Sequence, residues 1–146
     1  MMMIPPQILD DEISFKLYTL NRLIQQAYQS FLMPLRLTYP QYLVMKILLE
    51  EDQVPVNVIS SKLNLESNTV TPLLQRMEKQ GLLWREKKCE DHRQRIITLT
   101  RQGQDMRNDI TQVSTLVAES LLEQQLDCAM ANGLKDMLNA FINRIR

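Results

Sequence analysis

A run of hydroxyl, amide and cationic side chains between residues 67 and 79 has the chemistry needed to read base pairs. Asparagine and glutamine can bond the edge of adenine, arginine that of guanine, and the threonine methyl group can contact that of thymine. The candidate contact residues are Ser67, Asn68, Thr69, Thr71, Pro72, Gln75, Arg76 and Lys79. Amphipathic helices often carry such polar faces merely because they face solvent. The flanking elements are therefore needed to distinguish a DNA-binding face from a solvated one.

A hydroxyl and a phenol near the start of the chain form a second notable pair. Ser14 and Tyr28 are fourteen residues apart, almost four helical turns, so both border one face of a helix predicted from about Leu9 to Met33. The apolar residues of that face are Ile13, Leu17, Leu20, Ile24, Ala27 and Phe31. Simple core packing would account for either polar residue taken alone.

The sequence around the polar run predicts two short helices joined by a tight turn. The first has about eight residues, within VNVISSKLNL (56–65). Ser67 or Asn68 is expected to cap the second helix, Pro72 to lie within about its first turn, and Gly81 to end it. The apolar stripe of the second helix is Val70, Leu73, Leu74 and Met77. This spacing leaves the polar run on the opposite face.

A basic β-hairpin is predicted directly after the second helix. LLWREKK (82–88) and RIITLT (95–100) have the composition of strands, and a charged turn joins them. The basic residues on or near this hairpin are Arg85, Lys87, Lys88, Arg93 and Arg95, and their side chains are expected to meet phosphates or a narrow minor groove. A further, mostly apolar helix capped by Thr38 precedes the pair. Three helices followed by a hairpin predict a winged helix-turn-helix, within an all-α chain with a small hairpin wing.

Long helices are predicted at both ends of the chain. Thr100 is expected to cap a single helix over 101–125, and another should run from about Ala129 to Ile145. Their apolar residues include Ile110, Val113, Leu116, Val117, Leu121, Leu134, Leu138, Phe141 and Ile142. This is more apolar surface than one small winged helix needs, so we expect a two-fold homodimer. Packing back onto the same chain is the alternative.

These elements predict one domain over residues 1–146, with dimerisation helices at about 9–33 and 101–145 and a DNA-binding lobe at about 39–100. A length of 146 residues, 45% hydrophobic content and only 3 glycines suit a helix-rich domain. No apolar run approaches the roughly 20 residues that cross a bilayer, and the start lacks a signal peptide, so we expect a cytoplasmic protein without membrane contact. Two cysteines make neither a disulfide framework nor a zinc site, and we expect no metal or cofactor.

Charge is unevenly distributed along the chain. The formal net charge is zero, yet residues 67–107 carry nine basic and five acidic side chains, a local net of +4. Residues 1–66 and 108–146 are both net acidic. A basic centre between acidic ends predicts a local footprint for double-stranded DNA.

The chain resembles the MarR family of bacterial transcriptional regulators over nearly its whole length. The resemblance is most specific in LNLESNTVTPLLQRMEKQGLL and in EDHRQRIITLTRQG, where Asp91, Arg93 and the closing LTxxG match the pattern of the family. It implies a DNA-binding repressor, not an enzyme, that binds a pseudo-palindromic operator as a homodimer. The segments ISFKLYTLNRLIQQAY and LRLTYPQYLVMKILLE resemble the branch that senses organic hydroperoxides.

That branch has a reactive cysteine followed by tyrosines fourteen and twenty-five residues later. The resemblance therefore implies a sensor pocket of Ser14, Tyr28 and Tyr39, with serine at the cysteine position. Serine keeps the hydrogen bonds but has no thiolate to oxidise, so organic hydroperoxide is the expected signal only in a cysteine form. Some members have a resolving thiol near the position of Cys128, although an inert small residue is the commoner role.

Several alternatives stay open at this point. The serine is either an engineered replacement or a natural loss, and the retained Tyr28 and Tyr39 favour replacement. The signal is alternatively a small phenolic or aromatic ligand. A thiol-dependent peroxidase is less favoured, because no second thiol pair or catalytic base accompanies Ser14. A winged helix used only for protein contacts is less favoured, because the polar face from Ser67 to Lys79 suits the major groove.

Overall fold

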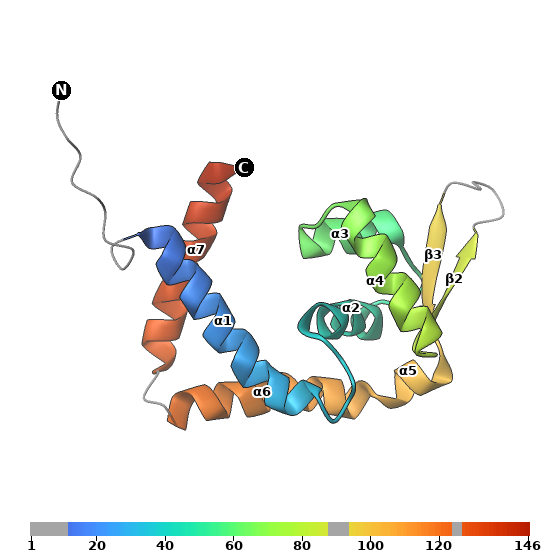
Figure 1. Ribbon diagram of the computed structural model, residues 1–146, viewed down its shortest axis with the longest axis horizontal. Helices are drawn as coiled ribbons and strands as arrows, with labels where there is room; N and C mark the ends of the chain where they lie inside the picture. The colour runs from blue at the N-terminus through green and yellow to red at the C-terminus, as the bar shows by residue number, and fades with distance from the viewer. Residues whose placement is uncertain (1–11, 88–93, 124–126) are drawn as a thin grey trace.

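The computed structural model describes residues 12–87, 94–123 and 127–146. Its elements are α1 (Ile13–Leu32), α2 (Tyr39–Glu50), β1 (Val54–Pro55), α3 (Val56–Leu63), α4 (Ser67–Lys79), β2 (Leu83–Lys87), β3 (Arg95–Leu99), α5 (Arg101–Asp105), α6 (Arg107–Glu123) and α7 (Cys128–Ile145). Figure 1 shows a lobe built from α2, α3, α4 and the sheet, and an arm built from α1, α6 and α7. Helix α6 of the arm extends beneath the lobe and so joins the two parts (Figure 1).

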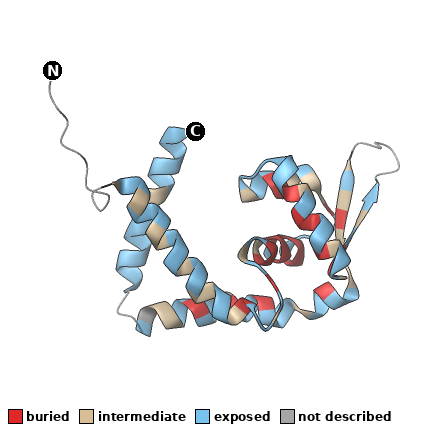
Figure 2. Ribbon diagram, in the orientation of Figure 1, coloured by how far each residue is buried: buried red, intermediate tan, exposed pale blue. Residues whose placement is uncertain are grey.

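The lobe has the predicted order of a winged helix-turn-helix. The turn between α3 and α4 passes through Asn64, whose φ of 55° is left-handed, a conformation that asparagine tolerates better than most residues. The apolar stripe of α4 is buried as predicted, with Val70, Leu74 and Met77 fully inaccessible to solvent. Figure 2 places most of the buried residues in α2, in α4 and in the middle of α6. The core of the lobe therefore continues into the arm.

The sheet has a third strand that the sequence did not predict. Strand β1 pairs antiparallel with β3, so the strand order is β1-β3-β2. The sequence signal was weak because β1 is only two residues long and ends in proline. Asp52 secures this corner, since its carboxylate accepts the amide hydrogens of Gln53 and Leu99 at 2.8 and 3.0 Å.

The prediction of a single helix over 101–125 is wrong, because the chain forms two helices that meet at Met106. Thr100 caps the first of them as predicted and accepts the amide hydrogen of Gly103 at 3.1 Å. The Met106 amide then donates a hydrogen bond to the Gly103 carbonyl, three residues earlier in the chain, and this contact tightens the last turn of α5. Gly103 is buried against the Leu82 carbonyl, so docking onto the lobe sets the direction in which α5 ends.

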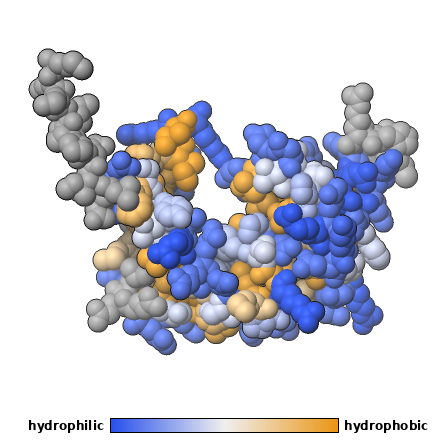
Figure 3. All heavy atoms as spheres, in the orientation of Figure 1, coloured by the Kyte–Doolittle hydropathy of each residue, from blue (hydrophilic) through white to orange (hydrophobic). Residues whose placement is uncertain are grey.

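Helix α1 begins at Ile13 and ends at Leu32, so the predicted end at Met33 was one residue late; residues 9–11 lie outside the described part of the chain. Thr38 caps α2 as predicted. Helix α7 shares few contacts with the rest of the chain, and its apolar residues form an orange patch in Figure 3. Phe141 and Ile142 are 50% and 48% exposed. None of the described helices is both long and apolar enough to span a membrane.

The close approach at Gly103 gives a test of this packing. A Cβ atom there would collide with the Leu82 carbonyl oxygen, so we expect Gly103→Ala to lower the free energy of unfolding by about 1–3 kcal/mol. Gly133→Ala in α7 is the matched control, because its Cβ would meet no atom within 4 Å. The free energy of unfolding of this control, measured by urea denaturation, should rise by about 0.5–1 kcal/mol. Equal effects of the two changes would contradict the packing described for α5.

Candidate nucleic-acid interface

Helix α4 presents the predicted contact residues on its outer face. Ser67, Asn68, Thr69, Pro72, Gln75, Arg76 and Lys79 are exposed, and Thr71 is half-buried. The opposite face of the helix packs into the core of the lobe. Because the two faces are separate, the outer one can bind a partner without disturbing the core.

The cap of α4 differs from the prediction. Neither Ser67 nor Asn68 caps the helix, because the extended residue is Glu66, whose carbonyl accepts the amide hydrogen of Val70. Ser67 already has helical backbone geometry, so its hydroxyl is not in the capping position. Both side chains are therefore left on the exposed surface at the start of the helix.

Pro72 also lies one turn further into α4 than predicted. It is the sixth residue of the helix, inside it rather than in its first turn. Proline has no amide hydrogen, so the Asn68 carbonyl lacks its usual helical donor. The Thr71 hydroxyl donates to the neighbouring Ser67 carbonyl at 2.8 Å. The helix continues because its other face is anchored in the core.

An ion pair fixes the wing against α4. The Arg85 guanidinium in β2 donates to one carboxylate oxygen of Glu78 in α4, from Nε at 2.8 Å and from a terminal nitrogen at 2.7 Å. The Arg85 amide donates to the other oxygen at 3.1 Å. These hydrogen bonds lower the pKa of Glu78 from its ordinary value, above all the bond from the Arg85 side chain. Arg85 therefore serves to dock the wing, although the sequence grouped it with the basic residues of the hairpin.

The basic residues left on the wing lie at the far end of the described strands. Lys87 and Arg95 are exposed and are directly paired across β2 and β3. Like charges opposite each other destabilise a strand pair, and a bound anion would relieve the repulsion. Asp91, Arg93 and the other turn residues up to position 93 lie outside the described residues.

A cluster of three tyrosines lies where the arm meets the lobe. The ring centres of Tyr28 in α1 and Tyr39 in α2 are 4.9 Å apart, with an edge-on arrangement. Tyr42 lies 5.5 Å from Tyr28 and 6.0 Å from Tyr39. Burial raises the pKa of Tyr28 and Tyr39, so both phenols are neutral hydrogen-bonding groups at pH 7. The structure thus brings together the two tyrosines that the sequence singled out.

Ser14 is not part of this cluster within one chain. It is exposed near the start of α1, and fourteen residues of helix separate it from Tyr28 by roughly 21 Å. A pocket that contains all three residues therefore requires a second copy of the chain. Cys128 is an exposed thiol at the first residue of α7, one residue before the predicted start of that helix at about Ala129.

The buried Tyr42 also links the lobe to the arm. Its hydroxyl lies 2.6 Å from the Ser114 hydroxyl in α6, and Lys46 donates to the same serine oxygen at 3.3 Å. The sequence did not single out these residues, because pairs 72 and 68 residues apart leave no local pattern. They connect the lobe to the helix on which it rests.

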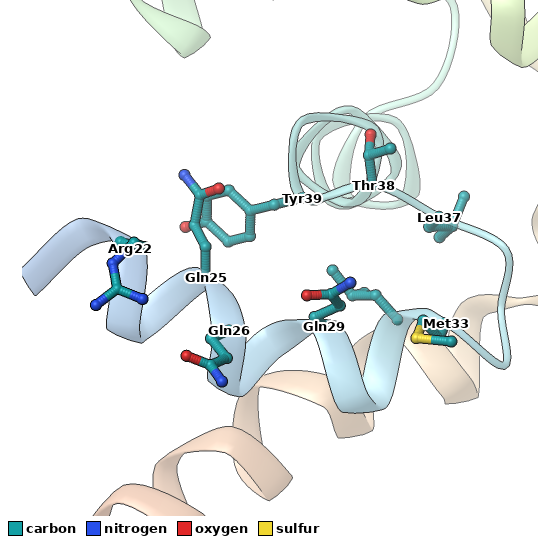
Figure 4. Close-up of a pocket in the computed structure, with 9 residues that line it drawn as sticks. Arg22, Gln25, Gln26, Gln29, Met33, Leu37, Thr38 and Tyr39 are labelled. Carbon is teal, nitrogen blue, oxygen red and sulfur yellow. The ribbon is translucent and has the colours of Figure 1, made fainter. Parts of the chain in front are cut away.

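A cavity of about 590 Å³ lies beside the tyrosine cluster, between α1 and the start of α2. Its lining residues are Arg22, Gln25, Gln26, Gln29, Leu32, Met33, Leu37, Thr38 and Tyr39. Figure 4 shows the side chains of Gln25 and Tyr39 close together at its edge. Amides and one guanidinium thus lie on the α1 side, while Leu37, Thr38 and the phenol of Tyr39 lie on the other. Among the described residues, no group of acidic, cysteine or histidine side chains has the arrangement of a metal site.

Comparisons with known proteins agree with this arrangement. Residues 26–110, more than half of the chain, match the family model "Transcriptional regulator SarA/Rot". The chain is 35% identical over 113 residues to the HTH-type transcriptional regulator MgrA of Staphylococcus aureus, with 77% of each protein covered. It is 40% identical over 95 residues to the organic hydroperoxide resistance transcriptional regulator of Bacillus subtilis (strain 168). That match covers 65% of each protein, so the chain spans just under two thirds of the Bacillus regulator.

The fold also matches a protein solved in complex with DNA. The chain superposes on reduced AbfR bound to DNA with a TM-score of 0.76 and 32% identity, and 94% of both chains is covered. AbfR is a protein of Staphylococcus epidermidis. The similarity therefore includes the arm as well as the lobe.

The ion pair that docks the wing gives a pH-dependent test. We expect Glu78→Gln to lower the free energy of unfolding by about 1 kcal/mol at pH 7, because a charge-assisted pair becomes a neutral one in a partly screened position. The folded-state pKa of Glu78 is depressed, so the stabilisation is present above pH 4.5 and is lost as the pH falls through that lowered pKa. Urea denaturation at pH 7 and pH 3 should show the difference from the parent chain shrinking in acid.

The control for this test is Glu51→Gln. Glu51 pairs with Lys62 at 3.5 Å, but the two side chains are 69% and 40% exposed. Exposed pairs contribute little, so we expect a smaller loss of stability at pH 7. An equal loss in both variants would mean that the Glu78–Arg85 pair does not anchor the wing.

Proposed function

The chain belongs to the SarA/Rot group of MarR-type transcriptional regulators, and from this premise we propose that it is a homodimeric repressor that binds double-stranded operator DNA. The observation that carries the proposal is the outer face of α4, which is polar and exposed beside a docked basic wing. The proposed mechanism is insertion of α4 into the major groove, with the wing against the adjacent backbone.

The residues of this surface have distinct roles in the proposal. Asn68 and Gln75 have amides suited to adenine, and Arg76 can bond guanine. Thr69 offers a methyl group for thymine, while Arg95 is placed for phosphate. Because the whole chain has no net charge, affinity depends on the local basic segment. Binding should therefore weaken with salt in proportion to a few phosphate contacts.

The homodimer is proposed from the arm. Helices α1, α6 and α7 enclose an apolar groove of about 900 Å³ that includes Leu23, Leu134 and Ile142. These side chains are 51%, 39% and 48% exposed in one chain, and a second copy would bury them. The proposal keeps the division expected from the sequence, with dimerisation helices at about 9–33 and 101–145 and a DNA-binding lobe at about 39–100. A two-fold dimer matches a pseudo-palindromic operator.

We further propose that the tyrosine cluster is what remains of an organic-hydroperoxide sensor. The support is the similarity to the Bacillus regulator together with the packing of Tyr28 against Tyr39. Ser14 would meet the phenols of the partner subunit, since its own are too far along the helix. Serine has no thiolate, so the chain as given would bind DNA but not respond to peroxide. Cys128 would be left without a thiol at position 14 to pair with.

A small phenolic or aromatic ligand is the second candidate signal. The cavity of about 590 Å³ is large enough for one and offers Tyr39, Arg22 and amides as partners. A rise in melting temperature with ligand, and with no oxidant, would favour this signal over the redox one.

The DNA-binding proposal predicts different effects for the two kinds of contact. We expect Arg76→Ala to weaken the free energy of operator binding by about 1–3 kcal/mol and to relax the sequence preference at one base pair. Arg95→Ala should weaken binding to all DNA sequences alike, and it should reduce the slope of log affinity against log salt concentration by about 1. Gel-shift titrations with the DNA upstream of the gene, at several salt concentrations, measure both effects.

Arg144→Ala is the control for these variants, because Arg144 is exposed on α7 away from the lobe. It should leave affinity and salt slope unchanged. If the parent chain shows no salt-sensitive, sequence-specific binding, the proposed function is wrong.

The sensor proposal predicts a gain of function. We expect Ser14→Cys to release DNA when cumene hydroperoxide is added, because it restores an oxidisable sulfur, while the parent chain stays bound. Ser30→Cys places a thiol on the same helix away from position 14 and should not respond. Release of all three proteins by the same dose would show that residue 14 is not the sensor.

A further inference from the structure

Two glutamines bridge the end of α4 to the turn between α1 and α2. Gln80 is the C-terminal cap residue of α4, and Gln41 lies in the first turn of α2. The Gln41 amide nitrogen donates to the Gln80 side-chain oxygen at 3.0 Å. The Gln80 amide nitrogen in turn donates to the Arg36 carbonyl at 3.3 Å. Three segments that are distant in sequence therefore meet in one chain of hydrogen bonds.

The orientation of Gln41 is fixed by its second role. Its side-chain oxygen accepts the Thr38 amide hydrogen at 2.9 Å, while its own backbone amide donates to the Thr38 hydroxyl at 3.4 Å. This capping box uses the oxygen of the Gln41 amide, so only the nitrogen remains for Gln80. Gln41 is 4% exposed, and a buried amide that lost this partner would be left unsatisfied.

The turn that receives the bridge also has a defined conformation. Arg36 has a φ of 56°, which is uncommon for a residue other than glycine. The next residue, Leu37, is buried, and its amide donates to the Leu32 carbonyl at the end of α1. The Arg36 carbonyl is therefore held at a set position relative to the arm.

The same end of α4 is attached to the wing. Gly81 follows Gln80 with a φ of 76°, and its carbonyl accepts the Thr100 hydroxyl at 2.6 Å. The C-terminal end of α4 is thus held from two sides, whereas the start of the helix at Ser67 is exposed. The stripe from Val70 to Met77 determines which face of α4 is buried, and these attachments fix the position of its C-terminal end, so moving one of them would tilt the helix.

We propose that Gln41 and Gln80 are positioning residues that set the angle of α4 relative to the arm, and so the distance between the two recognition helices of the dimer. This inference rests on the proposed DNA-binding function. The bridge also connects α4 to the cavity beside the tyrosines, because Leu37 and Thr38 line that cavity. Leu37 follows Arg36 in the chain, and Thr38 forms the capping box with Gln41. An occupant that shifts the turn would thereby shift α4.

The spacing of half-sites reports this angle. Dimers of this class bind half-sites about 10 base pairs apart, and one added base pair moves a half-site by roughly 3.4 Å and turns it around the duplex. A dimer with firmly held helices should discriminate sharply between such spacings. A dimer whose helices lack the bridge should discriminate less.

The test uses the full chain and the tightest pseudo-palindromic duplex that it selects from a randomised pool. Two further duplexes have one base pair added or removed at the centre. For Gln80→Ala we expect about fivefold weaker binding to the selected duplex, because a helix that is no longer held in place must be ordered when it binds. Its preference for that duplex over the altered spacings should fall at least threefold.

Two further variants separate positioning from simple destabilisation. Gln80→Glu can still accept the Gln41 hydrogen bond but cannot donate to the Arg36 carbonyl, so its spacing preference should be intermediate. Gln112→Ala removes an exposed glutamine from α6 and should behave like the parent chain. Melting temperatures of the free proteins show whether Gln80→Ala remains folded.

The outcomes are distinct. A flattened spacing preference in a folded Gln80→Ala chain supports the positioning role. An unchanged spacing preference, with or without weaker binding, overturns it while leaving the proposed function intact. If the parent chain selects no duplex, the proposed function is wrong and this inference falls with it.

Discussion

The structure depends on the burial of helix α2. Seven of its twelve residues are buried, and α1, α3, α4, α6 and β3 all pack around it. A helix that is apolar on most sides is stable only when other elements cover it, so α2 brings the lobe and the arm together. The direction of α4 follows, because its stripe from Val70 to Met77 has to face that same core.

Polar contacts at defined points then fix what the apolar core leaves adjustable. Apolar packing is non-directional, whereas a hydrogen bond has a set length and angle. The Glu78–Arg85 pair sets the wing against α4, Gln41 and Gln80 attach α4 to the α1–α2 turn, and Tyr42 with Ser114 attaches the lobe to α6. Each of these links joins elements whose relative positions matter for binding a long, regular duplex.

Most of the lobe could be predicted because its signals are local. The spacing of Val70 and Met77, the cap at Thr38 and the left-handed glycine at position 81 were all correct. The errors came where tertiary contacts override local preference. Gly103 packs against the lobe and ends α5, which broke the long helix that periodicity predicted. The core face likewise keeps α4 helical through Pro72, a turn later than local rules allow.

The candidate site shows the same division between what local sequence predicts and what tertiary contacts decide. The sequence by itself determined the chemistry: an outer face of α4 with amides, hydroxyls and a guanidinium, and a serine hydroxyl without a redox-active sulfur at position 14. Only the tertiary structure decided which groups meet. It packs Tyr28 on Tyr39, leaves Ser14 about four turns away, and turns Arg85 from a phosphate candidate into a partner of Glu78. Side-chain chemistry is a property of each residue, but distance between residues is set by the packing of the whole chain.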